Sequence, residues 1–176
     1  MIEIVDTFAS FPKQPNLKRL RQYHKKHCEV FKTYFLYHCQ DTDERLSKAI
    51  ERYSEDWKLI TKVHQSMECL VVEVCNTYET TYHMEFPISV NLIIGAYGSN
   101  AYTHRKIIPD ITFAMERLTP QEIPLKVIIA HEFGHTAHHI ISDNHQMDWQ
   151  RIRWEHPYIW LLQEGAATHF FQTDRS

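Results

Sequence analysis

The feature that most constrains the fold of this chain is the run AHEFGHTAHH, which contains His-Glu-x-x-His at residues 131–135. On a helix, His131 and His135 lie one turn apart on the same face, so both imidazoles can bind one metal ion. Glu132 lies about 100° away around the helix axis, which places its carboxylate beside the metal. The neighbouring positions are mostly apolar. The sequence therefore predicts a buried helix with two metal ligands and a carboxylate suited to take a proton from metal-bound water.

A second apolar helical stretch, IWLLQEGAATHF at residues 159–170, contains a third candidate ligand, Glu164. Catalytic zinc sites use three protein ligands and keep a fourth position for water. The small residues GAA that follow Glu164 let this helix approach a neighbour closely, which would bring the carboxylate to the metal. Asp143 or Asp148, just past the first helix, remains an alternative third ligand.

Together the two motifs resemble those of the gluzincin metallopeptidases. In that group the third zinc ligand is a glutamate on a later helix, often within Glu-Gly-x-Ala, and the sequence EGAA at residues 164–167 matches this pattern. The resemblance covers roughly residues 88–172. Within the group, the arrangement is most similar to the small bacterial predicted zinc proteases of the YjaZ type.

This resemblance implies a zincin-like peptidase with one Zn²⁺ per chain. His131, His135 and Glu164 would hold the metal, and Glu132 would act as general base and then protonate the leaving amine. The tetrahedral intermediate also needs a hydrogen-bond donor for its oxyanion. The sequence offers several candidates and does not choose among them: Tyr97, Tyr102, His104, His156 and Tyr158.

Two other functions are open to the same residues. One is a binding or regulatory protein that keeps the zincin fold without turnover, and the other is a metal-dependent hydrolase of a non-peptide amide or ester. The intact Glu132 favours catalysis, because a purely structural zinc site would not need it. Two histidines and one carboxylate also suit iron or manganese.

Composition and net charge indicate which class of protein this is and which partners it is expected to bind. Of 176 residues, 43% are hydrophobic and 23% charged, which is typical of a soluble globular domain. The formal charge of −3 predicts no attraction to nucleic acid or to an anionic membrane. The N-terminal sequence MIEIVDTFASF has no signal-peptide pattern, so the four cysteines are expected to be free thiols in the cytoplasm. The expected partner is a peptide or protein substrate, and the oligomeric state stays open.

The order of patterns predicts a single α+β domain over residues 1–176. Residues 1–85 are expected to be mainly helical, and residues 86–176 to hold a small sheet and the two motif helices. Helical patterns run over residues 16–40 and 54–82, the second with Asp41 or Asp43 as a candidate cap, and strands are expected at residues 1–5, 88–95 and 106–115.

Local signals also predict where the motif helices begin and end. Thr119-Pro120-Gln121-Glu122 fits a capping box with proline at the first helical position, and Asp143 with Asn144 would end that helix. Pro157 would open the last helix. The segment at residues 96–109 is the candidate for an edge strand above the metal, which would pair with an extended peptide.

Overall fold

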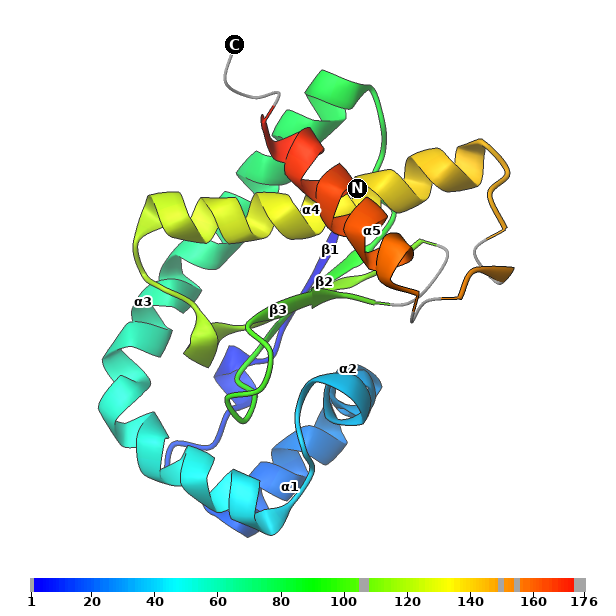
Figure 1. Cartoon of the computed structure of the whole chain (residues 1–176). Helices are drawn as coiled ribbons and strands as arrows, with labels where there is room; N and C mark the ends of the chain where they lie inside the picture. Colours follow the sequence, from blue (N-terminus) through cyan, green and yellow to red (C-terminus); the bar gives the residue numbers. More distant parts are fainter. Residues whose placement is uncertain (1, 105–107, 149–150, 154–155, 173–176) are drawn as a thin grey trace.

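The computed structural model describes residues 2–104, 108–148, 151–153 and 156–172, and it has an α+β fold (Figure 1). The predicted α+β class is therefore confirmed. The elements in chain order are β1 (Glu3–Asp6), α1 (Leu17–Lys26), α2 (Cys28–Thr33), a π-helix (Tyr34–His38), α3 (Asp43–Tyr82), β2 (Ser89–Ile93), β3 (Ala101–Thr103), β4 (Ile111–Ala114), α4 (Glu122–Asn144) and α5 (Pro157–Gln172). Two 3₁₀ turns, Phe8–Ser10 and Met115–Arg117, follow β1 and β4.

The four strands form one mixed sheet in the order β1-β2-β4-β3. β1 pairs parallel with β2, and β2 pairs parallel with β4. β3 pairs antiparallel with β4, with Tyr102 opposite Thr112. β3 is thus an edge strand among the described residues, and its outer side carries backbone groups that can pair with another extended chain.

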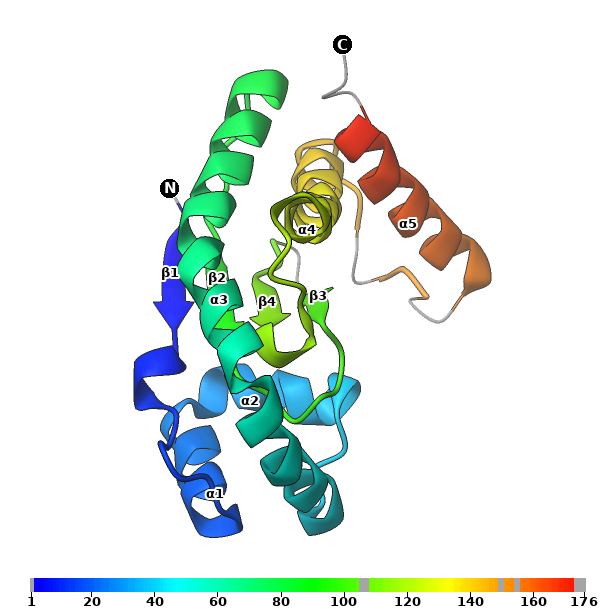
Figure 2. The same ribbon diagram turned by 90° about the vertical axis from the view of Figure 1, so that its left-hand side faces the viewer.

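Helices α3 and α4 cover one face of this sheet. On that face His64 of α3 binds Asp6 of β1, with 2.7 Å between Nε2 and Oδ2, and Thr103 of β3 contacts Glu132 of α4. Tyr78 ties the two helices together, since its hydroxyl donates to the Ala130 carbonyl at 2.8 Å. Figure 2 shows α4 nearly end-on, with α5 packed on the side of α4 that faces away from α3.

Side chains from distant parts of the chain hold the loop at residues 95–98, which leads into β3. The Glu116 carboxylate accepts the N–H groups of residues 95 and 97 at 2.9 and 3.0 Å. The Tyr34 hydroxyl accepts those of residues 96 and 98, both at 2.9 Å. Tyr53 and Arg45 donate to carbonyl groups of the same loop. The start of the edge strand is therefore fixed by the N-terminal helices and by Glu116.

The N-terminal helices differ from the single helix predicted over residues 16–40. α1 ends at Lys26, and His27 has φ −114° and ψ 41° at the junction with α2. The His27 Nε2 lies 2.6 Å from the Ser10 hydroxyl. This segment has no glycine or proline, so a contact with a distant residue accompanies a break that the local sequence does not signal.

Helix α3 begins well before residue 54, where its helical pattern was predicted to start. Its N-cap is Thr42, whose hydroxyl accepts the N–H of Arg45 at 3.2 Å, and not Asp41 or Asp43. Both aspartates instead bind the Arg21 guanidinium. The earlier start was readable from buried apolar residues at steps of three and four: Leu46, Ala49 and Tyr53.

The strand predicted over residues 106–115 is shorter, because β4 covers only Ile111–Ala114. Residues 105–107 lie outside the described residues. The predicted edge strand is β3, inside the segment at residues 96–109. The capping box was wrong: α4 begins at Glu122, and the Thr119 hydroxyl accepts the N–H of Gln121 at 3.3 Å in a turn before the helix.

Two further features concern the oxidation state of the cysteines and the possibility of a membrane-spanning helix. Cys28, Cys39, Cys69 and Cys75 are all free, as the sequence predicted. Within the described parts of the chain, every helix is too short or too polar to cross a lipid bilayer.

Candidate metal centre

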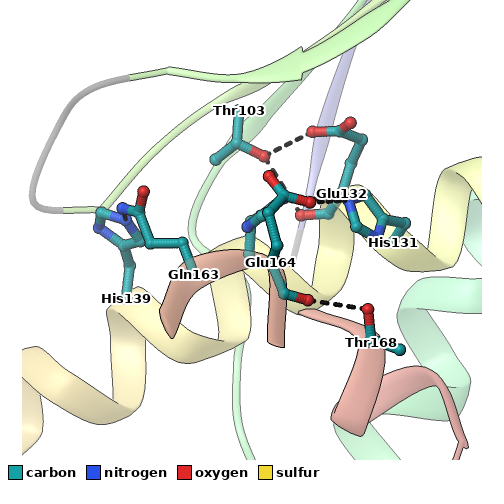
Figure 3. Close-up of polar contacts among 8 residues, drawn as sticks. Thr103, His131, Glu132, His139, Gln163, Glu164 and Thr168 are labelled. Atoms are coloured by element: carbon teal, nitrogen blue, oxygen red, sulfur yellow. Dashed lines mark hydrogen bonds and ion pairs between the residues drawn. The ribbon is translucent and has the colours of Figure 1, made fainter. Parts of the chain in front are cut away.

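Helices α4 and α5 bring the three predicted metal ligands together, and Figure 3 shows His131 and Glu164 among them. His131 Nε2 lies 3.2 Å from Glu164 Oε2, and His135 Nε2 lies 3.6 Å from Glu164 Oε1. The two imidazole Nε2 atoms are 3.1 Å apart. One ligand atom from each residue thus falls within 4.8 Å of the other two. The structure places the three side chains as the sequence pattern predicts.

The spacing of these atoms suits a tetrahedral zinc site. Zinc binds imidazole nitrogen and carboxylate oxygen at about 2.0–2.2 Å, so two ligands of a tetrahedron lie about 3.4 Å apart. The separation of the two imidazole nitrogen atoms, 3.1 Å, is close to that value, and so are the distances of 3.2 and 3.6 Å from each imidazole to its nearer oxygen of the Glu164 carboxylate. Burial lowers the pKa of His135 to about 3, with a further contribution from His131, and a neutral imidazole is the form that binds metal. The residues present therefore fit a zinc ion.

The close approach of α4 and α5 depends on Gly134, which lies between the two histidine ligands. A Cβ atom at this position would lie 2.8 Å from the Ala167 carbonyl oxygen and 2.9 Å from the Ala167 Cα. The sequence predicted that small residues after Glu164 would allow the two helices to approach closely. This prediction is confirmed for Ala167. Gly165 has open space around its Cα and takes no part in the contact.

Glu132 is buried beside the ligands, with only 7% of its surface exposed. Burial raises the pKa of its carboxyl to about 7, a hydrogen bond from Thr103 lowers it, and the Glu164 charge raises it. The Thr103 hydroxyl lies 2.8 Å from Glu132 Oε2 and 3.3 Å from the Glu132 carbonyl oxygen. A divalent cation at the ligands would favour the ionised carboxylate. The carboxylate is thus held between α4 and the edge strand.

A cavity of about 250 Å³ opens on these groups. Strand β3 lines one side of it, and α5 lines the other with Trp160, Gln163 and Glu164. His139, one turn after His135, lies in the same cavity and is 3% exposed. Its Nε2 lies 3.5 Å from the Gln163 amide nitrogen.

The candidate oxyanion donors do not direct their side chains to the ligands. Tyr102 points to the opposite face of the sheet from Thr103, because neighbouring side chains on a strand alternate, and its ring stacks on His38. His104 lies on that same face and binds Thr112 at 2.8 Å. The three others are placed as follows: Tyr97 binds Asp56, His156 is exposed, and Tyr158 is 76% exposed outside the cavity. Tyr102 and His104 nevertheless line the cavity, and the role of the five residues as oxyanion donors stays a prediction.

The alternative ligands also lie apart from the centre. Asp143 and Asp148 are exposed, and neither belongs to the His131–His135–Glu164 group that the described residues form. Thr168, one turn after Glu164, donates to the Glu164 backbone carbonyl at 2.8 Å, and the Glu164 carboxylate faces the two histidines.

Sequence reasoning missed two residues of this centre. Thr103 contacts Glu132 across 29 positions of the chain, and a threonine in a three-residue strand gives no signal of such a contact. Gly134 did carry a signal, because a glycine in the middle of an apolar helix often marks close packing. Comparison of the chain with protein-family models, with curated proteins and with solved structures found no match.

Proposed function

We propose that this chain is a zinc-dependent peptidase with a zincin-like fold. One observation carries the proposal: two imidazoles and one carboxylate converge at separations close to those between zinc ligands, with a buried carboxylate, Glu132, next to them. A structural zinc site would gain nothing from a second carboxylate kept out of water. The gluzincin resemblance of both motifs supports the same reaction.

His131, His135 and Glu164 would hold the metal. Bound zinc polarises a carbonyl group and lowers the pKa of a water ligand toward roughly 7. Glu132 would take the proton from the attacking water and deliver it to the leaving nitrogen. Its burial keeps it beside the reacting atoms and limits exchange of that proton with solvent.

The expected substrate is polypeptide in an extended conformation. β3 is an edge strand on one wall of the cavity, so its backbone can pair with a peptide whatever the side chains of that peptide. Four free cysteines suit a reducing compartment, and we place the activity in the cytoplasm.

The first experiment measures zinc per chain by mass spectrometry for the wild type and for Glu164→Ala. Glu68→Ala, an exposed glutamate of α3, is the matched control. We expect about one zinc in the wild type and the control, and a sharp loss in Glu164→Ala. A wild type that takes up no zinc in metal-replete buffer would refute the proposal. Zinc that survives the loss of Glu164 would assign the third ligand to another residue.

The second experiment separates a peptidase from the two other functions. Zinc-loaded wild type and Glu132→Gln are incubated with a broad pool of synthetic peptides, and the products are identified by mass spectrometry. We expect cleavage by the wild type and none by Glu132→Gln at equal zinc content. If the zinc-loaded wild type cleaves no peptide, the peptidase is refuted. The two other functions then remain: a binding or regulatory protein, and a hydrolase of a non-peptide amide or ester.

A further inference from the structure

The hydroxyl of Thr103 makes the side-chain contact from the sheet to the buried Glu132 carboxylate. It lies 2.8 Å from Glu132 Oε2, and its single proton is shared between this oxygen and the Glu132 carbonyl at 3.3 Å. A glutamate side chain has three rotatable bonds between its backbone and its carboxylate oxygen atoms, and a hydrogen bond of this length restricts where those oxygen atoms lie. The partner of that bond is the edge strand itself (Figure 3).

The backbone of Thr103 faces the open side of the sheet. In an antiparallel pair, the residues that bond to the partner strand alternate with residues whose N–H and C=O groups point away from it. The His104 N–H donates to the Asp110 carbonyl at 2.8 Å, and the Asn100 carbonyl accepts from Ala114 at 2.8 Å. The even-numbered residues of this strand therefore bond to β4. The N–H and C=O groups of Thr103 point outward, where an extended substrate would pair.

We propose that Thr103 is a positioning residue that joins substrate binding to catalysis. Its backbone pairs with the substrate, and its hydroxyl holds Glu132 at a fixed place relative to that backbone. The register of the substrate on β3 then sets which carbonyl group lies next to the base. This inference rests on the proposed function and adds a residue to it that no sequence motif marks.

The test compares zinc-loaded wild type, Thr103→Val and Thr103→Ser. Valine keeps the size and strand preference of threonine and removes the hydroxyl, whereas serine keeps the hydroxyl and removes a methyl group. On a peptide cleaved by the wild type, we expect kcat of Thr103→Val to fall by about tenfold or more, because a displaced base is costly. Its KM and zinc content should not change. Thr103→Ser should keep most of the wild-type kcat.

A merely structural role for Thr103 predicts the opposite order of the two variants, since serine packs worse than valine in a strand. The proposal is overturned if Thr103→Val is as active as the wild type. It is also overturned if Thr103→Ser loses as much kcat as Thr103→Val.

Binding of acetohydroxamate gives a readout that needs no turnover. This probe chelates zinc through both oxygen atoms and gives its proton to an adjacent carboxylate. We expect Thr103→Val to bind it about tenfold more weakly, as a misplaced charge-assisted hydrogen bond would, and Thr103→Ser to bind it as the wild type does. If the variants bind the probe as expected but no peptide is cleaved, the peptidase is refuted and the positioning of Glu132 by Thr103 is still supported. A zinc-loaded wild type that fails to bind the probe would overturn the role of Thr103.

Discussion

The contact between Gly134 and Ala167 gives the sharpest prediction of this structure, through the substitution Gly134→Ala. The new Cβ would lie 2.9 Å from the Ala167 Cα, and ordinary contact begins at 3.4 Å, so α5 must move by about 0.5 Å (3.4 − 2.9). Metal ligands tolerate errors of only about 0.2 Å. Glu164 lies on the same helix, one turn before Ala167. We therefore expect zinc affinity to fall by about tenfold or more.

A second glycine on the same pair of helices provides the matched control. At Gly165 a Cβ atom would meet nothing within 4 Å. Alanine is favoured over glycine inside a helix by about 1 kcal/mol. Gly165→Ala should therefore raise the free energy of unfolding and leave zinc affinity unchanged. At Gly134 the same gain is opposed by overpacking, which costs about 1–3 kcal/mol.

Two assays separate the effects on stability and on metal binding. Unfolding of the zinc-free proteins in guanidinium chloride measures stability, and competition with a chromogenic zinc chelator measures the dissociation constant. The reasoning is refuted if Gly134→Ala binds zinc as tightly as the wild type and gains as much stability as Gly165→Ala. That result would mean that α5 does not rest on Gly134 at the observed distance.

Three further substitutions test other parts of the structure. Glu116→Gln should lower the free energy of unfolding by about 3 kcal/mol, because its amide N–H₂ would face an N–H of the loop at residues 95–98; an unchanged urea midpoint would contradict this. Burial lowers the pKa of His24 from 6.5 to about 4, so stability should fall as pH falls through that window. His24→Leu should remove this dependence of the free energy of unfolding on pH. A wild type whose free energy of unfolding, measured by urea titration, is the same at pH 5 and pH 7 would refute the prediction. Tyr102→Phe should leave peptide hydrolysis unchanged, since the Tyr102 ring faces away from the ligands; a large fall in kcat would restore Tyr102 as a donor.

The two motif helices could be predicted because their signals are local. α4 ends at Asn144 and α5 begins at Pro157, as the sequence indicates. Spacings of one helical turn place His131 and His135 on one face whatever the rest of the chain does. The place of Glu164 required one more assumption, a close approach of the second helix. Small residues in both helices favour that approach.

Contacts between distant segments could not be predicted in the same way. The break at His27 comes with a contact to Ser10, and the position of Glu132 involves Thr103 of another element. Neither partner stands out by residue type, spacing or periodicity. The direction of the Tyr102 and His104 side chains could not be predicted either, because the direction of a side chain along a strand depends on the register, which no local pattern in this segment fixes.

The hydrogen bonds to the loop at residues 95–98 have a consequence for how the chain can be divided. A fragment that began at residue 87 would contain the three candidate metal ligands and Glu132. It would lack Tyr34, Arg45 and Tyr53, which bind N–H and carbonyl groups of that loop. Those backbone groups would lose their partners at the point where the chain enters β3. We therefore expect that residues 87–176 would not fold as an independent unit, because the N-terminal helices hold the start of β3 although they supply none of the candidate ligands.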